Sequence, residues 1–145
     1  MQRESNELQQ LVRTLSSRFR LLAVYAFGSR ATEVAARTRG EPAGVLCPAS
    51  DVDIGVLPAY GQPLSVQERV LLAAAFEDTL DVGRVDLVIL PEADPFLAAN
   101  VIRGERLYAR DPDEADEYEL YVLRRAGDLA PLERERIALI MGEQP

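Results

Sequence analysis

The sequence predicts a small α/β or α+β domain in which helices flank a short mixed sheet of three or more strands. Its 145 residues suffice for one compact domain and are too few for two comfortable ones. Short apolar runs of strand length alternate with segments of helical periodicity, which is typical of this class. We therefore expect one domain over residues 1–145, with a helical C-terminal tail at about 113–142.

The first expected elements are a short amphipathic helix and a buried strand. Apolar residues recur at helical spacing within residues 7–18, which predicts the helix. The run "LLAVYAF" at 21–27 is continuously apolar and predicts a strand buried on both faces. Residues 30–40 look helical, with Gly40 at their end, and the segment at 41–50, punctuated by Pro and Gly, predicts a loop.

Two more strands and a helix follow. Residues 51–57, "DVDIGVL", alternate between polar and apolar and predict a strand with one polar side. A helix is expected over 65–80, because Ser65 and Glu68 stand at capping-box spacing. The apolar run at 84–90 predicts the third strand.

The C-terminal third is expected to be helical. Residues 94–108 would form one helix with a proline at its first position. Two further helices would follow at 114–127 and 131–142, separated at Gly127 and begun again at Pro131.

The residue types that are missing restrict the chemistry. The chain has no His, no Lys and no Trp, so all 16 of its basic residues are Arg. This excludes nucleophile pairs that need His, imidazole metal ligands, a Walker lysine and a Schiff base. Catalysis has to come from carboxylates, hydroxyls, Arg and any metal ion that the carboxylates bind.

The net charge and the distribution of apolar residues restrict the possible binding partners and the cellular location of the protein. A net charge of −8 argues against a chain whose main task is binding duplex nucleic acid. The polar N-terminus does not resemble a signal peptide, and no apolar run approaches the roughly 18 residues of a membrane span. The lone Cys47 suits a reducing compartment, so we expect a cytoplasmic protein without a membrane segment.

Three aspartates are candidates for a metal site. Asp51 and Asp53 would point the same way from one strand, about 6 to 7 Å apart, and Asp86 interrupts the apolar run of the next strand. If these strands are neighbours, the carboxylates converge into a phosphoryl-transfer centre that would select Mg²⁺ or Mn²⁺. The alternatives are a solvated strand end for the first two and a salt bridge to Arg84 for Asp86.

A second Asp-x-Asp, at Asp111 and Asp113, is interpreted as structural. A proline separates the two aspartates and an acidic helix start follows them. We expect Asp113 to be an N-cap and Asp111 to be a solvated turn residue.

The turn after the first strand could bind phosphate. A buried strand that ends at Gly28, with Ser29 opening a helix, offers free backbone N–H groups and a hydroxyl where phosphate oxygens bind well. Arg30 adds a charge that could reach a phosphate. The alternative is an ordinary glycine turn with Ser29 as the N-cap.

The segments "FGSR", "SDVDIGV" and "VDLVIL" together resemble the nucleotidyltransferases of the DNA polymerase beta superfamily. More narrowly, they resemble the minimal nucleotidyltransferase (MNT) group, whose hallmark is Gly-Ser, a spacer, Asp-x-Asp and a third Asp on a later strand. The segment 91–114 is similar to the group's usual sequel, so the resemblance spans most of residues 21–114.

The resemblance implies a role for each matching residue. Gly28 and Ser29 would hold the nucleoside triphosphate, and Asp51 and Asp53 would ligate two Mg²⁺ ions. Asp86 would bind the metal that activates the acceptor hydroxyl, and NMP, here AMP from ATP, would be transferred with release of pyrophosphate. MNT proteins often resemble antitoxins that silence a HEPN-domain ribonuclease by transferring AMP to one of its Tyr residues, so a HEPN toxin is the implied partner.

The spacer departs from the family pattern. Residues 30–50 separate Gly-Ser from Asp-x-Asp, which makes 21 residues and a longer spacer than the family's usual one. We expect a tolerated surface insertion that affects how the triphosphate loop closes and which acceptor enters.

Two other functions stay open. The same chemistry could act on a small hydroxylated molecule such as an aminoglycoside, although such enzymes usually carry an extra substrate-binding domain. Alternatively, the chain could neutralise a partner by contact alone. The tail residues that could form such a surface are Tyr118, Tyr121, Leu123, Ile137, Ile140 and Met141.

Overall fold

The computed structural model describes residues 2–41 and 51–142. The helices are α1 (Gln2–Arg18), α2 (Ala31–Arg39), α3 (Val66–Leu80), α4 (Pro95–Ile102) and α5 (Pro112–Ile140), and the strands are β1 (Leu21–Phe27), β2 (Val52–Pro58), β3 (Val85–Ile89) and β4 (Glu105–Ala109). Two short 3-10 turns, η1 (Gly28–Arg30) and η2 (Leu90–Glu92), follow β1 and β3.

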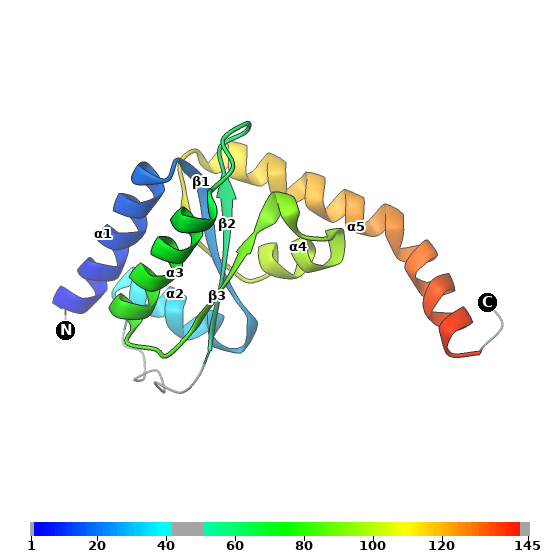
Figure 1. The fold of residues 1–145 in the computed structure, drawn as a ribbon, viewed down its shortest axis with the longest axis horizontal. Coiled ribbons are helices and arrows are strands. Elements are labelled where there is room, and N and C mark those ends of the chain that lie inside the picture. The colour runs from blue at the N-terminus through cyan, green and yellow to red at the C-terminus, as the bar shows by residue number, and fades with distance from the viewer. Residues whose placement is uncertain (1, 42–50, 143–145) are drawn as a thin grey trace.

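The sheet at the centre of the molecule has four strands in the order β3-β2-β1-β4 (Figure 1). β1 pairs antiparallel with both β2 and β4, whereas β2 and β3 run parallel. A short mixed sheet flanked by helices confirms the predicted fold class.

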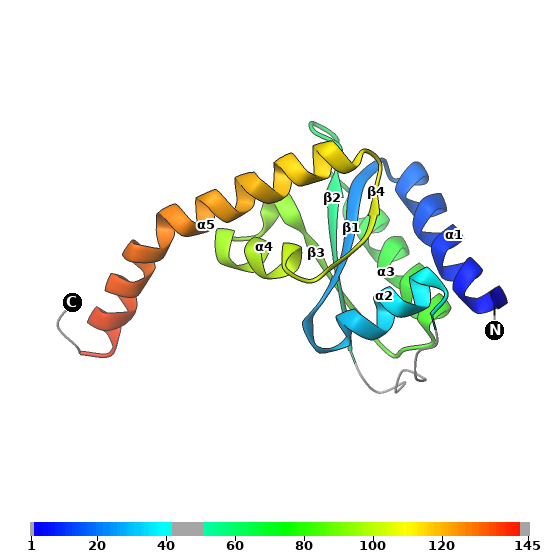
Figure 2. The ribbon, with the colours of Figure 1, turned by 180° about the vertical axis from the view of Figure 1, so that it is seen from behind.

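Helices cover both faces of this sheet (Figures 1 and 2). One face packs against α1, α2 and α3, through core residues that include Leu8, Val12, Val34, Leu72 and Phe76. The other face packs against α4 and α5, through residues that include Tyr25, Phe27, Ala98, Val101 and Val122. β1 contributes alternate residues to both cores, so it is buried on both faces as its apolar run predicts.

The alternation predicted for β2 is also confirmed. Val52, Ile54 and Val56 belong to the core beneath α1, α2 and α3, so Asp53 and Gly55 face the opposite side. On that side α4 lies close over Gly55, where an added Cβ would come within 2.3 Å of Val101 Cγ1. The carboxylate of Asp53 therefore lies next to the part of the sheet that α4 covers.

Two predicted helix starts are confirmed. Ser65 and Glu68 form the complete capping box of α3, with both reciprocal hydrogen bonds present. Pro95 is the first residue of α4, and the carboxylate of Asp94 caps that helix by accepting from two backbone N–H groups.

The helix predicted over 94–108 is wrong in its second half. α4 ends at Ile102, and the chain then turns and forms β4 along the edge of β1. At the turn, Gly104 lies so close to β1 that an added Cβ would be 2.3 Å from the Ala26 carbonyl oxygen. Pairing with an exposed strand edge satisfies the backbone here and outweighs the helical spacing of the side chains.

The two separate tail helices predicted at 114–127 and 131–142 are one helix. α5 continues through Gly127 and Pro131, and Figure 1 shows it bending in its C-terminal half as it leaves the body of the molecule. An internal proline removes one backbone hydrogen bond and bends a helix, but it need not end it.

The long spacer is partly helical. α2 takes up residues 31–39 and ends at Gly40, which adopts the left-handed conformation (φ 78°) expected of a C-terminal cap. The rest of the predicted loop, 42–50 with Cys47, lies outside the described residues. Its interpretation as a tolerated surface insertion stays a prediction.

Candidate active site

The Gly-Ser-Arg segment forms the turn η1 directly after β1. Gly28 has a positive φ of 77°, and a Cβ added to it would lie 2.3 Å from Asp53 Oδ2. A side chain at position 28 would therefore collide with the carboxylate as well as strain the backbone. Gly28 therefore brings the turn into direct contact with the carboxylate of Asp53. The sequence predicted only that the turn and this carboxylate belong to one site.

The sheet places Asp53 beside Asp86. Phe27 pairs with Asp53 across the antiparallel strands, and Asp53 pairs with Asp86 across the parallel ones. Residues paired in this way project from the same face of a sheet. Asp51 is exposed and precedes β2 by one residue. The predicted neighbourhood of the two acidic strands is therefore confirmed.

The carboxyl of Asp53 feels the charges of the other two aspartates. Burial raises the pKa of the Asp53 carboxyl above its ordinary value, and the negative charges of Asp86 and Asp51 raise this pKa further. A nearby cation would relieve this repulsion, and an all-oxygen set of this kind prefers a hard divalent ion. The donor chemistry fits Mg²⁺.

Asp86 also has the partner that the alternative interpretation proposed. Its Oδ1 lies 2.9 Å from Arg84 Nε, in a pair whose side chains are 39% and 69% exposed. Among residues 2–41 and 51–142, no three acidic side chains lie close enough together to hold a metal ion as they stand. A surface ion pair is worth about 1 kcal/mol at most, so a divalent cation would readily compete with Arg84 for Asp86.

The contacts of Arg30 and the position of Ser29 differ from those that the sequence predicted. The Arg30 guanidinium donates to both carboxylate oxygens of Glu33, at 2.9 and 3.2 Å, which offsets the charge that was expected to reach a phosphate. Ser29 lies within η1, and α2 begins two residues later at Ala31 without a side-chain cap. The alternative interpretation of Ser29 as an N-cap is therefore wrong.

The second Asp-x-Asp is structural, but its two residues exchange the roles predicted for them. Asp111 is the N-cap of α5, and its carboxylate accepts from the backbone N–H of Asp113 at 3.0 Å. Asp113 lies in the first helical turn, where a negative charge interacts well with the helix dipole.

A polar cavity of about 330 Å³ adjoins the Gly28 turn. Thr32 of α2 lines it on the side of the turn, and Asn100 and Arg103 of α4 line it as well. Sequence reasoning missed Asn100 and Arg103 because it placed 94–108 within one continuous helix. The signal that could have found them is Gly104, which marks a close approach of the backbone.

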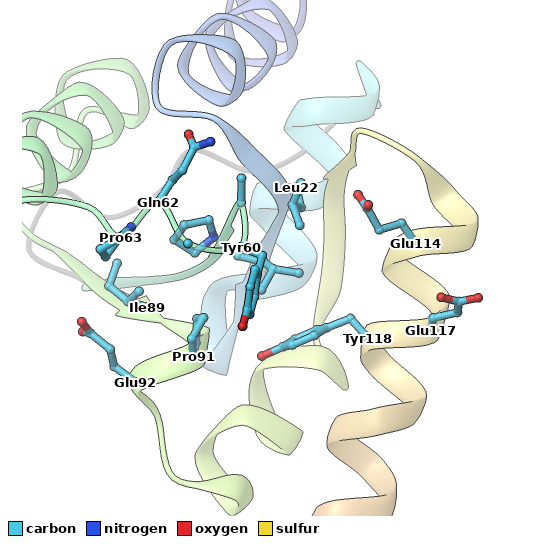
Figure 3. Close-up of a pocket in the computed structure, with 14 residues that line it drawn as sticks. Leu22, Tyr60, Gln62, Pro63, Ile89, Pro91, Glu92, Glu114, Glu117 and Tyr118 are labelled. Carbon is cyan, nitrogen blue, oxygen red and sulfur yellow. The ribbon is translucent and has the colours of Figure 1, made fainter.

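A larger cavity, of about 580 Å³, lies at the opposite end of the sheet (Figure 3). The cavity borders Leu22 near the start of β1, whereas the turn at Gly28 follows the end of β1. A strand of this length spans roughly 20 Å, so the cavity is far from that turn. Tyr60 and Tyr118 reach it from the loop after β2 and from α5 (Figure 3). Its lining holds carboxylates and no basic residue, so it does not suit a triphosphate.

Comparison with known proteins defines the class of this site. The family model described as "Polymerase beta, Nucleotidyltransferase" matches residues 9–113, which is most of the chain and includes all three candidate aspartates. The chain belongs to the polymerase beta nucleotidyltransferase family, and it is a nucleotidyltransferase by that membership. No curated protein matched the chain.

Solved structures narrow the likeness to MNT antitoxins. A toxin-antitoxin crystal structure with AMP-PNP is 24% identical, with a TM-score of 0.70, and the match covers 92% of this chain and 98% of that one. At this identity the likeness shows the fold alone. The MNT antitoxin in complex with a tri-AMPylated HEPN toxin of Shewanella oneidensis is 26% identical, with a TM-score of 0.62, and the match covers 98% of both chains. A second complex, MntA-HepT, is also 26% identical, with a TM-score of 0.61.

Proposed function

We propose that this chain transfers AMP from ATP to a hydroxyl group of a partner protein, a Tyr of a HEPN-domain toxin, and thereby acts as its antitoxin. The observation that carries the proposal is the contact between the Gly28 turn and Asp53, with Asp86 beside it on the neighbouring strand. The likeness to an MNT antitoxin whose toxin is AMPylated supports the choice of nucleotide and acceptor.

The reaction exchanges a phosphoanhydride bond of ATP for a phosphodiester bond to the acceptor. The acceptor oxygen forms a bond to the α-phosphorus of ATP, the bond between that phosphorus and the bridging oxygen breaks, and pyrophosphate leaves. The hydroxyl proton passes to water. Because the chain has no His and no Lys, neither an imidazole nor an amine base takes part.

Asp51, Asp53 and Asp86 would hold two Mg²⁺ ions, and Mn²⁺ could replace them. When bound, Mg²⁺ neutralises charge on the transferring phosphoryl group and lowers the pKa of the acceptor hydroxyl. Asp53 and Asp86 are half-buried whereas Asp51 is exposed, and β2 and β3 fix the position of Asp53 relative to Asp86. Gly28 and Ser29 would present backbone N–H groups and a hydroxyl to the phosphates.

The test uses the purified protein, MgATP and a HEPN-domain toxin. We expect the partner to gain the mass of AMP on a Tyr, and an Asp51→Asn/Asp53→Asn double variant to lose this transfer. Transfer by the double variant at the wild-type rate would exclude the mechanism.

A second candidate is neutralisation by contact alone, and the exposed end of α5 favours it. Leu132, Leu139, Ile140 and Met141, in the part of the helix that leaves the body, are each more than 60% exposed. Apolar side chains gathered in this way are typical of a protein interface. Neutralisation that survives loss of all three aspartates and fails in Leu139→Asp would favour this function over transfer.

Location and domain organisation stay predictions. None of the described helices is long and apolar enough to span a bilayer. We propose a cytoplasmic protein with one nucleotidyltransferase domain over 1–145, whose tail at 113–142 contacts the partner. Cell fractionation and limited proteolysis would test these two points.

A further inference from the structure

The nucleotide site has a charge problem that its predicted residues do not solve. The triphosphate tail of ATP has to approach a chain of net charge −8, next to the three aspartates. Arg30, the cation expected to help, is bonded to Glu33. A second cation is needed near Gly28 to hold the terminal phosphates.

The polar cavity beside Gly28 contains such a cation. Gly28 lines this cavity and also contacts the Asp53 carboxylate, so the cavity lies directly beside Asp53. Arg103 and Asn100 of α4 line it, together with Thr32 of α2. The cavity thus combines a guanidinium, an amide and a hydroxyl, all of which can donate to phosphate oxygens.

The charge of Arg103 is not used elsewhere. Its side chain is exposed and makes no ion pair with any residue of 2–41 or 51–142. Seven other arginines in these ranges pair with carboxylates: Arg30, Arg39, Arg69, Arg84, Arg106, Arg110 and Arg136. An unpaired guanidinium at a polar cavity is therefore available to an anionic ligand.

The backbone holds Arg103 in place. It is the C-terminal cap of α4, and its N–H donates to the carbonyls of Ala99 and Val101. The next residue, Gly104, is packed onto the end of β1. The backbone of a residue held between a helix end and a strand end loses little conformational freedom when the residue binds a ligand.

The cavity has one acidic residue, and its charge is partly offset. Glu105 lines the cavity, and its Oε2 lies 4.0 Å from Arg39 Nη1 on α2. The larger cavity at the opposite end of the sheet differs in charge, because its lining has several carboxylates and no arginine.

We infer that Arg103, assisted by Asn100 and Thr32, binds the β- and γ-phosphates of the nucleoside triphosphate and the pyrophosphate that leaves. This assignment rests on the proposed function and adds a phosphate-binding residue at the C-terminal end of α4, outside the Gly-Ser and Asp motifs. A nucleoside monophosphate lacks these two phosphates, so its binding should not depend on Arg103.

The test is calorimetric titration of the full-length chain with ATP, pyrophosphate and AMP in the presence of Mg²⁺. Arg103→Gln should weaken ATP and pyrophosphate binding by about ten- to a hundredfold and leave AMP binding within about twofold, as expected for loss of charge-assisted hydrogen bonds. Arg103→Lys should lie between the two, because lysine keeps the charge and loses the planar fork. Arg124→Gln, an exposed arginine of α5 that lines none of these cavities, is the matched control and should bind as the wild type does.

The outcomes separate this inference from the proposed function. Equal affinities of the wild type and Arg103→Gln for ATP and pyrophosphate would overturn the assignment of Arg103 and leave the proposed transfer standing. Equal weakening for AMP would overturn it too, because the contact would then lie at the α-phosphate or the nucleoside. A wild type that bound neither ATP nor pyrophosphate would overturn both.

Discussion

At the scale of single residues, Gly28 sets how closely the turn and the sheet approach each other. It has no side chain where Asp53 needs space, and its φ of 77° is one that glycine adopts without strain. Position 28 therefore has two separate reasons to be glycine, one in the backbone and one in the carboxylate that faces it.

Gly28→Ala should separate these two reasons when it is compared with Gly61→Ala. Gly61 has nearly the same φ, 74°, but nothing lies within 4 Å of an added Cβ. Both variants should lose stability to backbone strain, by about 1 to 3 kcal/mol. Gly28→Ala should also lose transfer activity because the carboxylate is displaced. Urea unfolding and AMP-transfer assays would show this, and equal activity losses in the two variants would contradict it.

Asp53→Asn should uncouple activity from stability. Because burial and two like charges raise the pKa of Asp53, its ionised form is disfavoured in the fold. The neutral amide should therefore not lower the free energy of unfolding at neutral pH, while transfer falls by at least about a hundredfold. Asp111→Asn is the matched control, since asparagine caps helices as well as aspartate does. An Asp53→Asn variant that failed to fold would contradict the expected unchanged stability.

The sequence predicted where the aspartates lie in the fold, but it did not predict which arginines are free to bind a ligand. Asp51, Asp53 and Asp86 could be predicted because each stands out against an apolar strand, and strand alternation fixes the side of the sheet that each one faces. Arginines carry no such signal in a chain with 16 of them. Whether Arg30 or Arg103 is available depends on Glu33 and on the turn at Gly104, which are tertiary facts.

At the scale of elements, two capping signals that lie close together in the sequence were reliable. The capping box of α3 and Pro95 of α4 act within one turn of helix, and both are confirmed. β4 was missed because its pairing with the edge of β1 is not encoded within its own residues. The break predicted in α5 relied on Gly127 and Pro131, which lower helix stability without forbidding a helix.

The capping box of α3 gives a pH-dependent contribution to stability. The backbone and side-chain hydrogen bonds with Ser65 lower the pKa of Glu68. A carboxylate with a lowered folded-state pKa stabilises the fold above its unfolded-state pKa, and this contribution disappears as the pH falls through the folded-state value.

Glu68→Gln should therefore show a shallower loss of stability on acidification than the wild type does. The amide can still accept the hydrogen bond from Ser65, so the two proteins should differ mainly in this acid limb. Thermal melts between about pH 5 and pH 3 would measure it. Identical acid limbs would show that the ionisation of Glu68 contributes nothing to stability, and Ser65→Ala should cost about 1 kcal/mol independently.

At the scale of the whole molecule, α5 is fastened at one end and unpartnered at the other. Its first half is held by Tyr25, whose hydroxyl donates to Glu119 at 3.0 Å, and by Arg106, which donates to both Asp116 and Glu119. Burial raises the pKa of Tyr25, and the Glu119 charge raises it further, so the phenol stays protonated and keeps donating. The second half carries the exposed apolar side chains Leu132, Ile137, Leu139 and Ile140, which a partner could cover.

A helix that continues for 29 residues through Pro131 gives the isolated chain an elongated form in solution. A straight helix of that length measures about 43 Å, whereas a compact chain of this size would have a radius of gyration of about 15 Å. Small-angle X-ray scattering of the monomer should give a larger radius and a skewed distance distribution, and a value of about 15 Å would show that the helix folds back. Its rotational diffusion should be anisotropic, so that binding a partner along α5 would change the tumbling time more than the added mass alone predicts.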